Sequence, residues 1–226
     1  MAEGRSLKEQ NAWLIRAVMI GHFVAFNWVA AGPLRLQSFS QSALLDKLEA
    51  NAAPGTAALG LIVIASLLLL GMVPPPLRDR LIHRRWTDPL PGCRAFSEIG
   101  PQSNHVDMRV LETAFGPLPE AGSDQNRLFY KLYRSHREDI GVLDAHGRYL
   151  AARDCGTITA ILMLTLPLLA LWATGDVGRS AVYGLALVVG YLLFSVAAKN
   201  YGWRMVQHVL ALSSSMQEPA KAGPAN

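Results

Sequence analysis

The sequence predicts an all-α membrane protein with four transmembrane helices and a mainly helical cytoplasmic insertion between the second and third spans. Hydrophobic residues make up 51% of the 226 residues, and they gather in long runs. Each run has the length of about 17 to 25 residues that a helix needs to cross a hydrocarbon core. Lysine and arginine are distributed unevenly between the loops that join the runs, as multi-pass proteins require.

The four predicted spans are residues 13–31, 57–73, 157–174 and 180–198. The second span carries no charge and ends at three consecutive prolines that begin with Pro74, because proline cannot continue a helix. The third contains Pro167, which membrane helices tolerate as a kink. Only "GDVGR" joins the third and fourth spans, so these two helices are expected to be antiparallel neighbours.

These spans divide the chain into three segments. Residues 1–73 form an N-terminal membrane hairpin, residues 74–154 form a cytoplasmic domain, and residues 155–226 form a C-terminal membrane hairpin with a cytoplasmic tail. The first span is expected to stay in the mature protein, because polar residues interrupt the apolar core that a cleavable signal peptide needs.

The basic residues orient the chain. With the amino terminus inside, the inner segments hold 17 lysines and arginines and the outer loops hold three. Inner loops carry the excess of positive charge in membrane proteins, so both termini and the long insertion are predicted to be cytoplasmic. The outer segment at residues 42–51 places its leucines on one helical face and is expected to lie flat on the outer interface.

The stretch "LLLLGMVPPPLRDRLIHRRW" is interpreted as the exit of the second span from the bilayer. Arg78, Arg80, Arg84 and Arg85 follow the prolines and are expected to meet the anionic headgroups of the inner leaflet. An alternative is that the same arginines bind a nucleotide or phosphate ligand.

Two helices are expected in the insertion, at residues 105–115 and from Ser123 or Asp124 onward. The second helix pairs Arg134 with Glu138 and Asp144 with Arg148 at i,i+4. It either runs into the third span as a stalk, with a break near Gly141 or Gly147, or packs against the headgroups.

No strong catalytic motif is present. The candidates for an enzymatic site are Cys93, His105, Asp107, His136 and His146. His136 and His146 lie about 15 Å apart along one continuous helix and cannot hold one ion, so neither a metal site nor a cofactor is expected. Cys93 and Cys155 lie in sequence predicted to be cytoplasmic, where thiols stay reduced, so no disulfide is expected.

Polar and small residues within the spans are further candidates. Arg16 and Asn27 share a face of the first span and can both snorkel to an interface, whereas His22 favours a buried hydrogen bond over a pore lining. In the fourth span, Ala186 and Gly190 form a small-xxx-small face for close helix packing, within the chain or between copies.

A resemblance adds a biological setting. The cytoplasmic run "PLPGCRAF", then "QNRLFYKLYR", then "HGRYLAARD" before a span resembles a pattern in uncharacterised small multispan membrane proteins of bacteria. The layout is similar to that of the membrane effectors of bacterial anti-phage defence systems. The resemblance implies a bacterial inner (cytoplasmic) membrane location, and it implies no catalytic or binding residue.

Three functions follow as hypotheses. The first is an inner-membrane effector or pore-forming protein whose cytoplasmic domain receives a signal or protein partner. The second is an anchor or assembly subunit that recruits a cytoplasmic partner, and the third is a small inner-leaflet enzyme, although a non-enzymatic role is favoured.

The expected partners are the lipid bilayer, a cytoplasmic protein and a second copy of the chain. No specific nucleic-acid binding is expected, because the 12 basic residues of the insertion are nearly balanced by 11 acidic ones. The predicted partner or ligand surface comprises Arg84, Arg85, Arg134, Arg137 and Arg148.

The orientation is testable with reporter fusions. Fusions at Asn51 and Gly178 are expected to report an outside location, and fusions at Gly122 and at the carboxyl terminus an inside one, because of the bias in basic residues. Paired alkaline phosphatase and fluorescent-protein activities measure this. A cytoplasmic signal at Asn51 would contradict the four-span arrangement.

Overall fold

The computed structural model describes residues 11–31 and 52–217, and every regular element in this part of the chain is helical. Contacts divide it into two units. The first unit contains the described residues of Met1–Arg78 and Ala151–Ser195, and the second contains those of Asp79–Leu150 and Val196–Asn226. The predicted interfacial segment at residues 42–51 lies outside the described residues.

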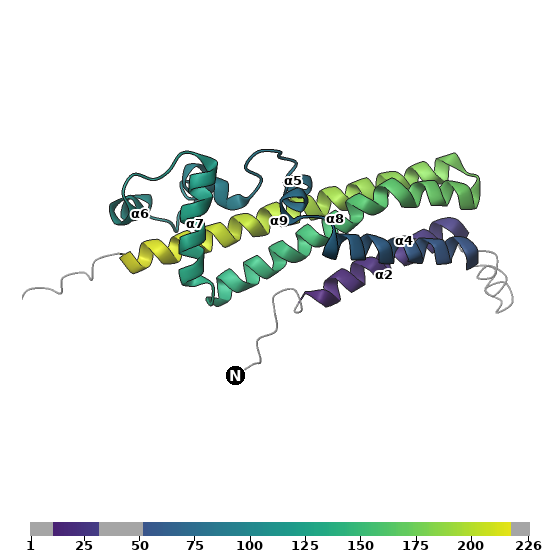
Figure 1. Ribbon diagram of the computed structural model, residues 1–226, viewed down its shortest axis with the longest axis horizontal. Helices are drawn as coiled ribbons and strands as arrows, with labels where there is room; N and C mark the ends of the chain where they lie inside the picture. Colours follow the sequence, from purple (N-terminus) through teal and green to yellow (C-terminus); the bar gives the residue numbers. More distant parts are fainter. Residues whose placement is uncertain (1–10, 32–51, 218–226) are drawn as a thin grey trace, which may run out of the picture. The chain divides into compact units, whose positions relative to one another are not determined.

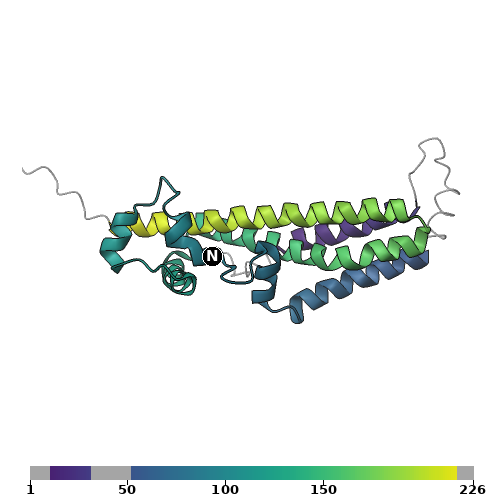
Figure 2. The same cartoon turned by 90° about the horizontal axis from the view of Figure 1, so that it is seen from above.

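The first unit consists of apolar helices (Figures 1 and 2). They are α2 (Ala12–Ala31), α4 (Ala52–Gly71), the later part of α8 (Ile140–Thr174) and the earlier part of α9 (Val177–Gln217). The prolines after α4 also begin α5 (Pro75–His83), because proline is tolerated in the first turn of a helix.

Close packing of α8 against α9 depends on glycines in the first unit. A two-residue turn, Gly175 and Asp176, joins the helices, and Gly175 has a positive φ of 66°. A Cβ on Gly184 would lie 3.4 Å from Cγ of Pro167, so the part of α8 around this proline lies directly against α9. The predicted antiparallel pair is therefore present in the structure, as Figure 2 shows.

Three helices are long and apolar enough to cross a membrane: α2, α8 and α9. The apolar stretch Ala52–Leu67 of α4 is shorter than these three candidates. An all-helical chain with three candidate spans is thus established by length and composition. The fourth span is taken up again under the proposed function.

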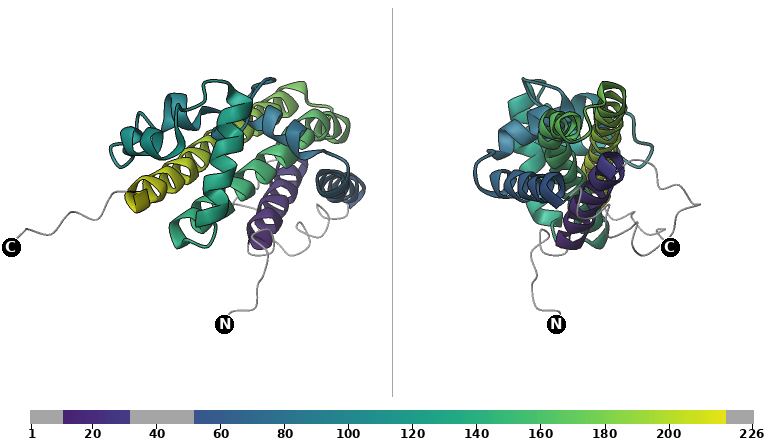
Figure 3. Two further views of the ribbon diagram at one scale, coloured as in Figure 1. Left: turned by 60° about the vertical axis from the view of Figure 1, so that its left-hand side comes forward. Right: turned by 90° about the vertical axis from the view of Figure 1, so that its right-hand side faces the viewer.

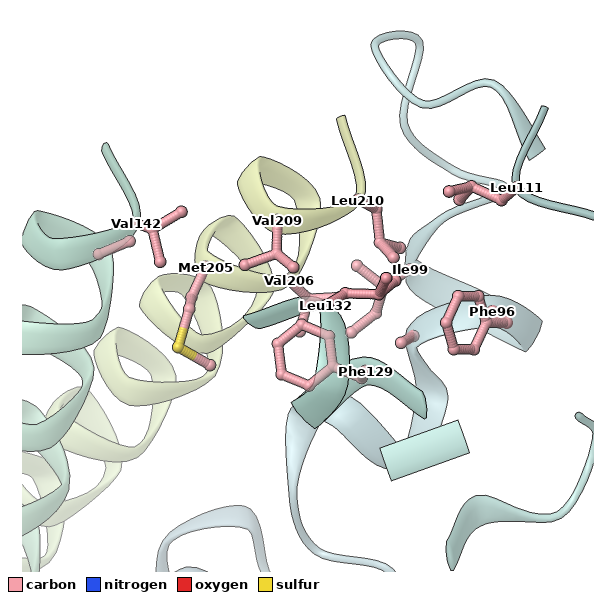
Figure 4. Close-up of a cluster of buried hydrophobic side chains, with 12 residues drawn as sticks. Phe96, Ile99, Leu111, Phe129, Leu132, Val142, Met205, Val206, Val209 and Leu210 are labelled. Atoms are coloured by element: carbon pink, nitrogen blue, oxygen red, sulfur yellow. The ribbon is translucent and has the colours of Figure 1, made fainter. Parts of the chain in front are cut away.

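The second unit is built around the ends of α8 and α9 (Figure 3). It adds most of α5, a 3-10 turn η2 (Pro91–Arg94), a π turn η3 (Ala95–Ile99), α6 (Met108–Phe115) and α7 (Gly122–His136). Its core joins Ile99 and Phe129 to Val206 and Leu210 of α9 and Val142 of α8 (Figure 4). The part of α9 that contains Val206 and Leu210 is therefore a core helix of this unit.

The side chain of a buried glutamine forms hydrogen bonds with backbone groups around η3. Gln125 on α7 is 1% exposed, and its Oε1 accepts hydrogen bonds from the backbone N–H groups of Phe96 and Ser97 at 3.1 and 3.2 Å. Its Nε2 donates to the carbonyl oxygen of Glu120 at 2.8 Å. One side chain thereby satisfies backbone groups in a segment whose proline and glycine content prevents a long helix.

The helix boundaries in the second unit differ from the predicted ones. α6 begins at Met108 because the Asp107 side chain caps it, accepting from the N–H groups of Arg109 and Val110 at 2.9 and 3.2 Å. α7 ends at His136 and α8 starts at Ile140, so the predicted stalk breaks just before Gly141. Because of this break, Arg134 and Glu138 do not share a helix.

We expect Gln125→Leu to destabilise the second unit by about 3 kcal/mol, because it leaves buried N–H and C=O groups around η3 without partners. Gln102→Leu, at an exposed position of the same unit, is the matched control. Thermal unfolding of the full chain in detergent, followed by near-ultraviolet circular dichroism, measures the difference. Equal melting temperatures for the two variants would show that Gln125 has no such role.

Candidate functional site

A run of α8 is buried on every side. All residues at positions 151–160, "AARDCGTITA", are buried, although the run contains Arg153 and Asp154. Most helices at a protein surface bury only one face. Charged side chains in such a place need partners, because an isolated buried charge costs several kcal/mol.

The charges of this run form a buried ion cluster with Arg78, defined here as Arg78, Arg153 and Asp154. The Nε of Arg153 donates to Oδ1 of Asp154 at 3.1 Å, and Nη1 of Arg78 lies 3.8 Å from the same oxygen. The side chains of Arg78 and Asp154 are each 6% exposed. The Nε of Arg78 also donates to the carbonyl oxygen of Val73 at 2.9 Å. Arg78 thus connects the residues after α4 to α8 within the first unit.

The burial of Arg78 contradicts the prediction that its side chain meets lipid headgroups. Arg78 is predicted from the sequence to meet lipid headgroups together with Arg80, Arg84 and Arg85, but it is buried in the protein. The other three are exposed. The physical reason is the carboxylate of Asp154, which offers Arg78 a partner in the protein interior.

A second polar chain continues in the second unit. The Tyr149 hydroxyl donates to Oδ1 of Asp79 at 3.1 Å, and Nε2 of His83 lies 3.3 Å from the Tyr149 oxygen. The rings of His83 and Tyr149 stack with centroids 5.9 Å apart. Asp79 follows Arg78 in the chain, and Tyr149 precedes Arg153 by one helical turn of α8. The polar chain therefore fixes α5 onto α8 within the second unit.

The predicted arginine surface is exposed throughout. Arg84, Arg85, Arg134, Arg137 and Arg148 all lie at the surface of the second unit. Arg148 is the most constrained of them: its Nε donates to both carboxylate oxygens of Asp144 at 2.9 Å, and its guanidinium carbon lies 5.9 Å from the Tyr201 ring centroid. The predicted Asp144–Arg148 pair is therefore confirmed. Arg137 pairs with Glu138 at 3.5 Å. Exposed pairs of this kind add little stability.

The three intramembrane polar residues have different environments. His22 Nε2 lies 3.0 Å from Oγ1 of Thr159 on α8, and Asn27 Nδ2 donates to the carbonyl oxygen of Phe23 at 2.8 Å. Arg16 is exposed on α2. The contact between His22 and Thr159 joins α2 to the buried run of α8.

The small-residue face of α9 divides between two surroundings. A Cβ on Gly190 would lie 3.9 Å from Cγ2 of Thr159, so this position faces α8 of the same chain. Ala186 is exposed and lines a groove of about 820 Å³ between α2 and α9, together with Gly21 and Trp28. Gly190 therefore serves packing within the chain.

The candidates for enzymatic chemistry lie in different surroundings, although His105 and Asp107 line one groove of about 590 Å³. Burial, and then the neighbouring Asp88 carboxylate, raise the pKa of the Cys93 thiol, so this thiol is protonated near neutral pH and is a poor nucleophile. Nδ1 of His146 lies 2.8 Å from the Tyr133 hydroxyl, which joins α7 to α8. Burial is the main cause that raises the pKa of Tyr133. Across residues 11–31 and 52–217, no group of three His, Cys, Asp or Glu residues is placed to hold a metal ion, and both cysteines are free.

Sequence reasoning misses the buried ion cluster. Its available signal is the charged pair Arg153 and Asp154, which only two residues separate from the predicted span at residues 157–174. The partner Arg78 gives no such signal, because it lies among other arginines of the same local pattern.

We expect Asp154→Asn to destabilise the first unit by about 3–5 kcal/mol, because it removes the buried negative charge that the guanidinium groups of Arg78 and Arg153 both contact. Asp144→Asn, on the same helix but in an exposed pair, is the matched control and should change little. The melting temperatures of both variants in detergent measure the effect. Equal stability would indicate that the cluster does not bear on folding.

Comparisons with known proteins add no family to this picture. No protein-family model, curated protein or solved structure matches the chain. Any function must therefore be inferred from the residues and from their arrangement in the two units.

Proposed function

We propose that this protein is a four-span, non-enzymatic effector or pore-forming protein of the bacterial inner membrane. In this proposal its second unit is cytoplasmic and receives a signal or protein partner, and the spans respond. The setting suggested by the resemblance is anti-phage defence. Both termini are cytoplasmic, α4 is the second span, and the protein acts as a homo-oligomer.

The observation that carries the proposal is the continuity of α8 and α9. They contain 35 and 41 residues. A span uses about 20 residues, so each helix continues well beyond a bilayer. Tyr183 and Leu187 of α9 belong to the core of the first unit, and Val206 and Leu210 of the same helix belong to the core of the second. A partner that displaces the second core thereby acts directly on a membrane helix.

The buried ion cluster supports the same proposal. Arg153 and Asp154 lie near the start of the first unit's part of α8, and Arg78, in α5, is the last residue of that unit's N-terminal part. Buried ion pairs add little net stability, but they favour one arrangement over others. A cluster at this point of the chain suits a switch between two discrete helix positions.

An anchoring role is the second candidate. The exposed arginines of α7 and the nearly balanced charge of the insertion favour a specific protein contact, which an anchor needs as much as an effector does. The two functions differ in whether the membrane itself responds.

We expect induction of the wild-type chain, together with its neighbouring genes, to depolarise the cell membrane. The double variant Arg134→Glu, Arg137→Glu should abolish depolarisation while leaving membrane insertion intact, because it reverses the charge of the proposed partner surface. Arg127→Glu with Lys131→Glu, two exposed cations on the same helix, is the matched control and should retain activity. A potential-sensitive dye provides the measurement.

Two results would count against this proposal. Wild-type protein that is inserted but causes no depolarisation would exclude the effector function and favour the anchor. Equal loss of activity in both double variants would show that net charge, and not the Arg134 and Arg137 surface, determines the response.

A further inference from the structure

Two cations flank one tryptophan in the second unit. Trp203 lies on α9, with Nζ of Lys199 5.1 Å and Cζ of Arg94 6.0 Å from its ring centroid. Lys199 precedes Trp203 by one helical turn, and Arg94 is the last residue of η2. Cations at this distance from an indole are attracted to its ring face. Two positive charges are thereby concentrated at one side chain.

Two donors at this place lack an acceptor. Among the described residues, neither Nε of Arg94 nor Nε1 of Trp203 has a hydrogen-bond partner, although both atoms are buried. Both groups can only donate. Buried donors in folded proteins are almost always satisfied, so an acceptor from outside the chain is expected here.

The charge of the surroundings indicates what that acceptor is. Nη1 of Arg94 lies 3.2 Å from Oε2 of Glu98, and this is the carboxylate that faces the guanidinium. Lys199 has no carboxylate partner in the part of the chain that the structure describes. One positive charge therefore remains uncompensated beside two free donors.

We propose that Arg94, Lys199 and Trp203 bind an anionic phosphate group. A phosphate offers several acceptor oxygens and a negative charge, which matches the chemistry of an ammonium, a guanidinium Nε–H and an indole N–H gathered around one ring. The phosphate comes from a lipid headgroup or from a free phosphate compound. Lys199 directly follows the predicted span at residues 180–198, and the lipid source rests on the proposed four-span arrangement. The site itself rests on the side chains alone.

The test uses the full chain in lipid nanodiscs. The first arm measures, by native mass spectrometry, how much phosphatidylglycerol the protein retains from discs of equal parts phosphatidylglycerol and phosphatidylcholine. The second arm titrates inorganic phosphate onto protein in pure phosphatidylcholine discs and follows tryptophan fluorescence. We expect Lys199→Gln to lower affinity about tenfold in the arm that corresponds to the true source, because it removes one charge-assisted contact.

Matched variants separate binding from folding. Lys199 is exposed, so Lys199→Gln should leave the melting temperature unchanged. Lys131→Gln, another exposed lysine of the second unit, removes the same charge and should leave binding unchanged. Trp203→Phe keeps a ring but removes the N–H donor, and it should weaken binding to an extent similar to that of Arg94→Gln.

Each outcome either supports the phosphate site and identifies its source or overturns the site. Selective loss of phosphatidylglycerol in the Lys199 variant supports a lipid headgroup, and selective loss of the phosphate titration supports a free phosphate compound. Equal binding by wild type, Lys199→Gln and Lys131→Gln in both arms overturns the site. Depolarisation is measured separately, so failure of the effector function and failure of this site are distinguishable.

Discussion

The arrangement of the first unit depends on the need to neutralise charge inside a helix that is buried on all sides. Arg153 and Asp154 cannot reach solvent from the buried run of α8, so they pair with each other and with Arg78. Apolar helices can pack in several registers of similar energy, because hydrophobic contacts are not directional. A guanidinium that must reach one carboxylate and the Val73 carbonyl allows far fewer. The cluster therefore restricts how α5 can pack against α8 within the first unit.

Specific contacts also fix the helices α8 and α9, each of which contributes residues to both units. Tyr149 lies one turn before Arg153 on α8, and it bonds to Asp79, the residue after Arg78. On α9, glycines allow close approach at two points: Gly184 faces Pro167 in the first unit, and a Cβ on Gly202 would lie 2.6 Å from Cγ of Pro91 in the second. Each unit thus fixes its own part of the two helices. The helices α8 and α9 each contribute residues to both units, and this continuity is the basis of the proposed coupling.

Much of the helical layout is predictable from the sequence, and most of the site is not. Apolar runs, the Pro74–Pro76 stop and the Asp144–Arg148 pair depend on local spacing, which the sequence displays directly. Gln125 and Arg78 depend on partners distant in the chain, and nothing local separates them from exposed residues of the same type. The short helix α5 is missed for a related reason: its prolines end one helix and begin another, and the pattern alone indicates only the first role. The contacts of Trp203 with Arg94 and Lys199 include a partner more than 100 residues away, so the local pattern does not indicate them in full.

Buried donors without partners are informative here because the chain satisfies comparable groups elsewhere. Gln125 uses both ends of its amide, and the guanidinium of Arg78 has two acceptors. Besides Arg94 and Trp203, the unpartnered buried side-chain atoms among the described residues are the hydroxyl oxygens of Ser180 and Tyr183, both on α9. A hydroxyl hydrogen rotates about its C–O bond to find an acceptor, and a serine in a helix has its own backbone carbonyls within reach. The N–H directions of an indole and of a guanidinium Nε are fixed by their planar groups, so Arg94 and Trp203 have no such freedom. Their acceptor has to come to them, and the excess positive charge beside them selects an anion.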